Sequence, residues 1–515
     1  MSEVVDGALR AVAKGTLLVL VGTFVGMLLA FFARVVLVRN VSVADYGIFS
    51  IALAVVGLVT VFSELGLQGG IIRNIAFFRG KQDAGMVLGV IFSAFQLGAL
   101  ASLFLFAVLF LLSGFLSLNV FHNAALSLVL KVLLVAAPLT VVVDFLSAVF
   151  RGLGRAEGVF FYDFLLNLVK IASFLVVAFL GLSFFGMVYA YLFSFVFVAL
   201  LFVLYSFMKL PSLVDFGVRK VMQRRNLLLF SVPLLAQAVM GMIMEWSDTL
   251  MIGYFMSAES VGVYNMAMPV SKLVPLFLVA LVFFYVPVAS GFFAKNLLSE
   301  VRRLYAVLTK WVFSFSLPLF LVVFLFPDAL LQILFNTASP EASLSLRILS
   351  LGFFVHVVMG PTASTLVVFG RTKTIMAFSV FAGLLNVLLN FVLIPRFGIV
   401  GAAAALSVSF VLMHAFYLLV LFSRFRIQPF TGKYLRPFVS SVLCVAVVYY
   451  FTKSLFAFPP LWLILLMFIV FLLVYALCVL LTRSFDDEDL MILLAAEKQL
   501  GLKLSFFKGL LRRFV

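Results

Sequence analysis

The chain has 515 residues, of which 65% are hydrophobic and only 11% are charged. No soluble globular domain buries so large an apolar fraction, so the composition excludes a soluble enzyme, a disulfide-stabilised secreted domain and a disordered chain. The net charge of +16 would suit a nucleic-acid partner. The basic residues, however, occur in short gaps between long apolar runs, and that placement indicates membrane orientation and no nucleic-acid binding.

Long apolar runs follow one another along almost the whole chain. A bilayer core is crossed by about 20 apolar residues of helix, and fourteen runs reach a comparable length. The chain is therefore predicted to be an all-α membrane protein with about fourteen transmembrane helices. In chain order the predicted spans cover residues 16–38, 48–65, 86–112, 126–150, 159–180, 184–207, 227–253, 261–288, 304–326, 346–369, 375–394, 399–422, 438–458 and 461–481.

The distribution of Lys and Arg predicts the direction of these spans. Of the 36 basic residues, 28 lie before the first span, in even-numbered gaps or in the tail after the last span. The other eight lie in odd-numbered gaps or within spans. Because cytoplasmic loops are enriched in Lys and Arg, we expect a multi-pass protein of the plasma membrane with both termini in the cytoplasm.

The sequence also contains an internal duplication. Three pairs of short segments resemble each other at offsets of 215, 216 and 212 residues, and their register favours a repeat. They are Asp45-Tyr46-Gly47-Ile48-Phe49-Ser50 with Ser260-Val261-Gly262-Val263-Tyr264-Asn265, Gly154-Arg155 with Gly370-Arg371, and Phe185-Gly186-Met187-Val188 with Phe397-Gly398-Ile399-Val400. Six spans per repeat is an even number, so the two repeats run in the same direction, as in transporters whose halves rock about a substrate site.

The duplication predicts five regions. Residues 1–207 form an amino-terminal six-helix lobe, residues 208–226 a cytoplasmic linker, and residues 227–423 a carboxy-terminal six-helix lobe. Residues 424–482 add two extra transmembrane helices. Residues 483–515 form an amphipathic cytoplasmic tail whose basic, Phe-rich end is typical of a segment at an anionic membrane surface.

Several segments of the first half and of the duplicated region resemble one transporter family. Together they resemble the polysaccharide-biosynthesis branch of the multidrug/oligosaccharidyl-lipid/polysaccharide exporter (MOP) superfamily, which includes O-antigen flippases. The resemblance implies a flippase that moves lipid-linked glycans from the inner to the outer leaflet. It rests on Ala44-Asp45-Tyr46-Gly47-Ile48-Phe49, Glu64-Leu65-Gly66-Leu67, Phe150-Arg151-Gly152-Leu153-Gly154-Arg155, Asp248-Thr249-Leu250-Met251-Ile252-Gly253-Tyr254 and Val261-Gly262-Val263-Tyr264-Asn265.

Ionised residues inside the predicted spans are the candidate functional groups. Each costs about 2.5 to 3.5 kcal/mol near a helix centre, so these groups must pair or face a hydrated cavity. Lys272 is the best candidate for binding an anionic phosphate or pyrophosphate, with Arg34 and Asn265 as further substrate-binding residues. Glu245 and Asp248 are candidates for gating or coupling, with Arg34 as a possible partner. Fixed structural ion pairs are the alternative for all four charges.

The sequence does not suggest an enzyme, a cofactor or a metal site. It contains no phosphate-binding Gly-x-x-x-x-Gly-Lys-Ser/Thr motif and no metal-ligand spacing. The expected partners are a lipid-linked glycan and membrane lipids, the expected state is a monomer, and the membrane potential is the expected driving force. The alternative within the superfamily is a cation-coupled antiporter of drugs or metabolites.

Overall fold

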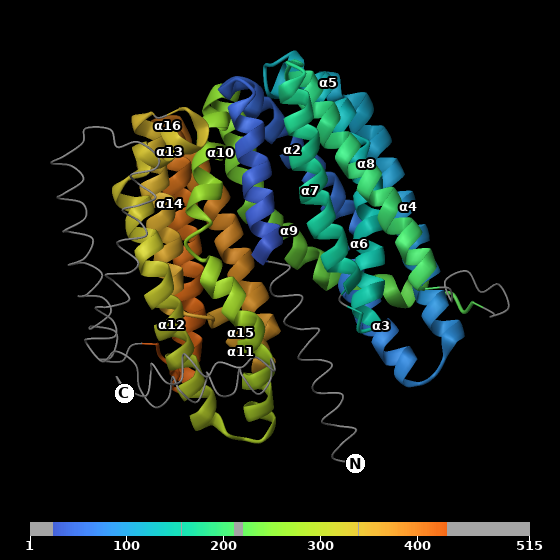
Figure 1. Ribbon diagram of the computed structural model, residues 1–515. Helices are drawn as coiled ribbons and strands as arrows, with labels where there is room; N and C mark the ends of the chain where they lie inside the picture. The colour runs from blue at the N-terminus through green and yellow to red at the C-terminus, as the bar shows by residue number, and fades with distance from the viewer. Residues whose placement is uncertain (1–23, 156, 211–219, 338, 430–515) are drawn as a thin grey trace. The chain divides into compact units, whose positions relative to one another are not determined.

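The computed structural model describes residues 24–155, 157–210, 220–337 and 339–429, and within them every regular element is a helix (Figure 1). The two extra spans and the tail predicted after residue 429 lie outside this part of the chain. The first half begins with a helix over residues 24–39. It continues with α2 (Val43–Glu64), α3 (Leu67–Gly80), α4 (Ala84–Phe115), the π-helical turn η1 (Leu116–Val120), α5 (Ala125–Leu134), α6 (Ala136–Gly152), α7 (Glu157–Phe179) and α8 (Phe184–Lys209).

The second half repeats this succession of long apolar helices. It contains α9 (Arg224–Phe255), α10 (Ala258–Ser271), α11 (Leu276–Ala294), α12 (Leu298–Leu325), α13 (Pro327–Phe335), α14 (Pro340–Met359), α15 (Thr362–Val368) and α16 (Thr372–Phe425). Nine helical stretches of the described residues are long and apolar enough to cross a membrane, or ten if the bent pair α10 and α11 counts as one span. The protein is thus an all-helical, multi-pass membrane protein.

Breaks in the helices occur where the sequence has unusual backbone requirements. Gly398 inside α16 has a φ of 59°, which separates the two spans predicted at 375–394 and 399–422. Leu65 and Gly66 both adopt left-handed conformations between α2 and α3. The helices α10 and α11 meet at an angle of 51°. Pro275, which lacks a backbone N–H, directly precedes α11, where the helix is completely interrupted.

The described chain divides into two compact units. One contains residues 24–265 and the short segment Asn390–Ile399 of α16. The other contains Met266–Leu389 and residues 400–429. The first unit therefore includes α9 and the first turns of α10 in addition to the helices of the first half. The lobe boundaries predicted from the duplication stay a prediction.

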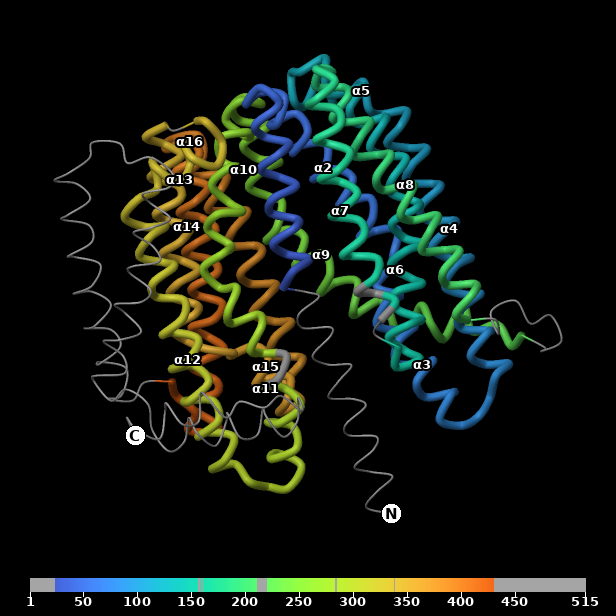
Figure 2. The backbone as a smooth tube through the Cα atoms, in the orientation of Figure 1, coloured from blue at the N-terminus to red at the C-terminus, as the bar shows by residue number. Residues whose placement is uncertain are grey.

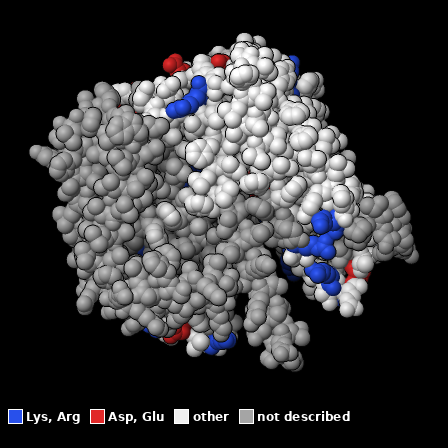
Figure 3. All heavy atoms as spheres, viewed as in Figure 1, with Lys and Arg blue, Asp and Glu red and all other residues white. Residues whose placement is uncertain are grey.

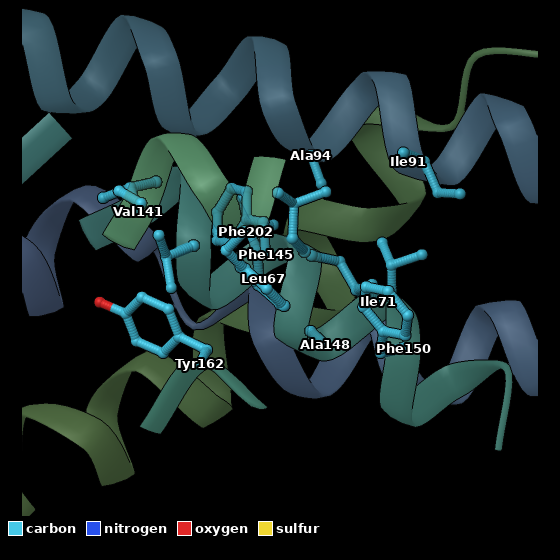
Figure 4. Packing of buried hydrophobic residues seen from close by; sticks show 14 of the residues in the cluster. Leu67, Ile71, Ile91, Ala94, Val141, Phe145, Ala148, Phe150, Tyr162 and Phe202 are labelled. Carbon is cyan, nitrogen blue, oxygen red and sulfur yellow. The ribbon is translucent and has the colours of Figure 1, made fainter. Parts of the chain in front are cut away.

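The first unit has an apolar core where α3, α4, α6, α7 and α8 meet (Figure 4). Phe145 on α6 is fully buried, and its ring meets that of Phe95 edge-on at 5.7 Å. Phe150 stacks on Phe202 at the same distance between ring centroids. A Cβ added to Gly98 on α4 would overlap the ring of Phe145, so the glycine lets the helices approach and the aromatic side chains fill the space between them.

The outward faces of the same helices are apolar, as lipid contact requires. Phe179 at the end of α7 is 91% exposed, and Leu111 on α4 is 82% exposed. The helices α7 and α8 run side by side in the tube drawing (Figure 2), and both present large apolar side chains on their outer faces. On the face drawn in Figure 3, charged side chains gather towards the ends of the described surface and not along its middle.

Candidate transport site

A buried polar network lies among the apolar helices of the first unit, and Asp248 on α9 is at its centre. The Asp248 side chain is 1% exposed. Its Oδ2 accepts a 2.6 Å hydrogen bond from the Tyr264 hydroxyl on α10, and its Oδ1 accepts a 2.6 Å bond from Nδ2 of Asn390 on α16. A buried carboxylate needs such donors to offset its lost hydration. Asp248 thus connects three helices through one side chain.

Asn265, predicted to bind substrate, lies in the adjoining part of the same network. Its Nδ2 donates to Thr249 Oγ1 at 3.1 Å and to the Val261 carbonyl at 3.0 Å, while Thr249 Oγ1 contacts its Oδ1 at 3.3 Å. The backbone carbonyl of Asn265 accepts a 3.1 Å bond from the Tyr46 hydroxyl on α2. In this conformation the amide is used to join α9 with α10, and its predicted role towards a substrate stays a prediction.

Arg34 and Glu245 lie at the margin of this network. Arg34 is half-buried and acts electrostatically on the Tyr46 hydroxyl. Glu245 is exposed, and its negative charge lies close enough to the Tyr264 hydroxyl to interact with it electrostatically. The structure therefore brings four of the five predicted site residues into one neighbourhood within one unit. The two carboxylates of α9 have different surroundings, because Asp248 is buried within the protein and Glu245 is exposed.

Lys272, the fifth predicted residue, lies in the second unit at the interruption between α10 and α11. It is half-buried, and its backbone N–H donates to the Met268 carbonyl at 3.1 Å as the last helical bond of α10. Ser271 beside it is fully buried and donates to the same carbonyl at 2.7 Å. A lysine predicted near the middle of a span thus stands where the span is broken, a feature that marks substrate sites in many transporters.

A second polar cluster, not predicted as such, lies in the first unit between α2 and α6. The carboxyl groups of Glu64 and Asp144 are both half-buried and lie close enough to interact electrostatically. Two like charges so close together disfavour each other, and burial strengthens the effect. Nothing in the local sequence indicates that Glu64 has a neighbour 80 positions away in the chain.

Two histidines of the second unit form a third polar cluster. The centres of the imidazole rings of His356 on α14 and His414 on α16 lie 3.7 Å apart. His414 Nδ1 is 2.8 Å from Thr362 Oγ1, whereas His356 Nδ1 has no hydrogen-bond partner among the described residues. The described residues contain no group of three or more His, Cys, Asp and Glu side chains that would hold a metal ion.

Sequence reasoning missed Tyr264 and Tyr46, which link the network across helices. A signal for both was present, since they lie in the two duplicated segments beside the repeat-related glycines. Asn390 was not singled out either. Its partner could not be read from the sequence, because Asp248 lies 142 positions earlier.

Comparison with known proteins points to one transporter family. The model of the polysaccharide biosynthesis protein family matches residues 12–293, and the MatE model matches residues 233–392. The probable low-salt glycan biosynthesis flippase Agl15 of Haloferax volcanii is 31% identical over 203 residues, which cover 38% of this chain and 42% of that protein. This match spans less than half of that relative. The uncharacterized membrane protein MJ1068 of Methanocaldococcus jannaschii is 23% identical over 432 residues, 78% of this chain and 82% of that protein.

Solved structures agree in fold. The lipid II flippase MurJ in an inward closed conformation aligns with a TM-score of 0.69 at 15% identity, covering 90% of this chain and 98% of that chain. An inward-facing multidrug resistance MATE family transporter of the MOP superfamily aligns with a TM-score of 0.66 at 15% identity, covering 78% and 94%. At this identity the likeness concerns the fold of the helices.

Proposed function

Since the chain belongs to the polysaccharide biosynthesis protein family, a family of MOP-superfamily transporters and not of enzymes, we propose that it flips a lipid-linked oligosaccharide across the membrane. The cargo carries an anionic phosphate or pyrophosphate between lipid and glycan. It moves from the cytoplasmic to the outer leaflet by alternating access of the two repeats. Both chain ends are cytoplasmic, and the transporter works as a monomer.

The observation that carries this proposal is the position of Lys272 at the interruption between α10 and α11. A broken helix leaves backbone groups without helical partners, so the chain there is suited to contact a polar ligand inside the membrane. A lysine at that point adds a positive charge that attracts phosphate. Arg34 and Asn265 stay candidates for contact with the headgroup and its sugars, as the sequence suggests.

The physical task explains why such a protein needs polar groups and no nucleotide site. Each glycan hydroxyl that loses water without a new partner costs several kcal/mol, so the headgroup needs a polar route while its lipid tail stays in the bilayer. An interior-negative potential favours the exit of an anion by about 2.3 kcal/mol per charge per 100 mV. The same potential draws an empty cationic site back towards the cytoplasm, so we infer that turnover needs no sodium or proton gradient.

The role of Lys272 is tested by replacing its charge. In a strain that lacks the gene, a lipid-linked saccharide should accumulate on the inner face of the membrane, and the intact protein should relieve the accumulation. Lys272→Gln should lower the rate of relief by roughly tenfold to hundredfold, because a charge-assisted contact contributes about 1.5 to 3 kcal/mol. Lys272→Arg should retain most of the rate.

The matched control is Lys131→Gln. Lys131 is also half-buried within a span, but its ammonium lies 5.6 Å from the centre of the Phe110 ring, and the sequence favours its reaching the membrane surface. We expect an unchanged rate. If Lys272→Gln and Lys131→Gln lowered the rate equally, the proposal that Lys272 binds the substrate would be wrong.

The alternative function is cation-coupled export of drugs or metabolites. It is favoured by the match of residues 233–392 to the MatE model and by the buried carboxylate of Asp248 within that region. Export of small organic cations that is abolished by Asp248→Asn, with no accumulation of a lipid-linked saccharide in the deletion strain, would support the antiporter over the flippase.

A further inference from the structure

Two glycines bring the helices α2 and α10 into backbone contact. A Cβ added to Gly47 on α2 would overlap the backbone carbonyl of Ala258, and it would lie 2.9 Å from the Gly262 backbone nitrogen. A Cβ added to Gly262 on α10 would overlap the backbone carbonyl of Val43. Both glycines are buried, and all four residues belong to the same compact unit. No residue larger than glycine fits at either position without separating the helices.

This contact is reciprocal with respect to the duplication. At the repeat offset of 215 residues, Gly47 corresponds to Gly262 and Val43 corresponds to Ala258. Gly47 faces Ala258, while Gly262 faces Val43. Each repeat therefore presents the same two positions to the other, as in an interface related by a two-fold axis. We call these four residues the glycine crossing.

The forces at the glycine crossing differ from those in a fixed core. Backbone atoms of small residues attract each other through van der Waals contact and weak C–H···O bonds. Most of the atoms nearest to the two glycines are backbone atoms, and the exception is Val43 Cγ1. The adjacent hydroxyl of Tyr46 adds a single neutral hydrogen bond to the Asn265 carbonyl. Separation at the two glycines therefore breaks mainly backbone contacts, whereas the core around Phe145 is filled by aromatic side chains.

The glycine crossing lies near one end of both helices. Ser42, which caps α2, is exposed, as is Glu259 in the first turn of α10. By the distribution of basic residues, this end faces the outside of the cell. We propose that the glycine crossing is a reversible closure of the outer end, which parts each time the transporter opens outwards. The inference rests on the proposed function for its direction, because a flippase must release its cargo on that side.

The test is the accessibility of a buried cysteine to an external reagent. In a background with Cys444→Ser and Cys478→Ser, Val261→Cys places a thiol at a fully buried position beside Gly262. A membrane-impermeant maleimide is added outside intact cells. Adding Gly47→Ala or Gly262→Ala should raise the labelling rate on the order of tenfold or more, because overpacking of this size favours the separated state. Tyr46→Phe should raise it by roughly twofold to tenfold, as expected for one lost hydrogen bond.

Two controls distinguish opening from general damage. Gly114 on α4 has nothing within 4 Å of an added Cβ, so Gly114→Ala should leave the labelling of Val261→Cys unchanged. A second reporter, Val149→Cys, lies at a fully buried position of the apolar core on α6 and should stay unlabelled in every variant. Labelling of both reporters would indicate unfolding and would overturn the proposal.

Two further results would also overturn it. The first is an unchanged labelling rate of Val261→Cys in a folded Gly47→Ala variant. If both alanine variants fail to fold, the second is an unchanged labelling rate of Val261→Cys in the Tyr46→Phe variant. Because labelling needs no substrate, a failure of the proposed flipping activity leaves this result interpretable. Opening of the glycine crossing without glycan transport would reject only the proposed function.

Discussion

The apolar core around Phe145 and the polar network around Asp248 belong to the same compact unit, yet different forces hold them. The core is filled by interlocking rings from α4, α6 and α8. The network joins α9, α10 and α16 through a few directed hydrogen bonds. Many small contacts tolerate little movement, whereas a few hydrogen bonds can be exchanged for others when helices shift. We therefore expect the core to stay rigid and the network to rearrange when helices move.

The largest effect on stability is expected in the core. Phe145→Ala should lower the free energy of unfolding by about 3 to 5 kcal/mol, because it removes a fully buried ring and leaves a cavity. Unfolding in detergent micelles measures this loss. The control Phe179→Ala, at a 91% exposed position, should change the value by about 0.5 kcal/mol or less. Similar losses at both positions would mean that the ring at Phe145 is not part of a tightly packed core.

A smaller loss of stability is expected in the network. Asp248→Ala removes the acceptor of two hydrogen bonds and leaves the Tyr264 hydroxyl and the Asn390 amide buried without it, at a cost of about 2 to 3 kcal/mol. Asp248→Asn keeps one acceptor oxygen and should cost less. The same unfolding measurement applies, and it would contradict the role of the network if Asp248→Ala proved as stable as the unchanged protein.

A double-mutant cycle sharpens this prediction. Tyr264→Phe alone should destabilise the protein by about 1 kcal/mol, and the combination with Asp248→Ala should cost less than the sum of the single changes. Additive effects would show that the 2.6 Å bond between these side chains contributes little to the energy of the fold.

The smallest effect is expected at Glu64 and Asp144, the neighbouring carboxyl groups of α2 and α6. Asp144→Asn should change the free energy of unfolding by about 1 kcal/mol or less, because it removes one of two like charges and leaves an amide of the same size that can form a hydrogen bond by donating to Glu64. Asp144→Leu cannot form this bond and should cost more. The two variants form a matched pair of similar size, and equal stabilities would argue against a structural role for the bond.

The sequence predicted the helices better than it predicted their contacts. Apolar runs locate spans because the bilayer demands them, so each of the first twelve predicted spans overlaps a described helical segment. The positive φ of Gly398 separates two spans that the sequence had already placed on either side of it.

Contacts between distant residues were not predictable in the same way. The duplication pointed to Gly47 and Gly262 as equivalent positions, but equivalence alone does not reveal that they touch. The partners of Asp248 and Glu64 depend on which helices pack together, and local sequence carries no record of that choice. A buried charge shows that a partner is required, and only the packed structure identifies it.

The central claim is that the chain moves an anionic lipid-linked glycan outwards under the membrane potential. The most direct measurement reconstitutes the purified protein in vesicles that carry a lipid-linked saccharide in the inner leaflet. An external glycan-modifying enzyme then reports its arrival outside at fixed ion concentrations. The account predicts that an interior-negative potential accelerates this arrival without a sodium or proton gradient. Arrival that requires such a gradient at fixed voltage, or no arrival under any condition, would contradict it.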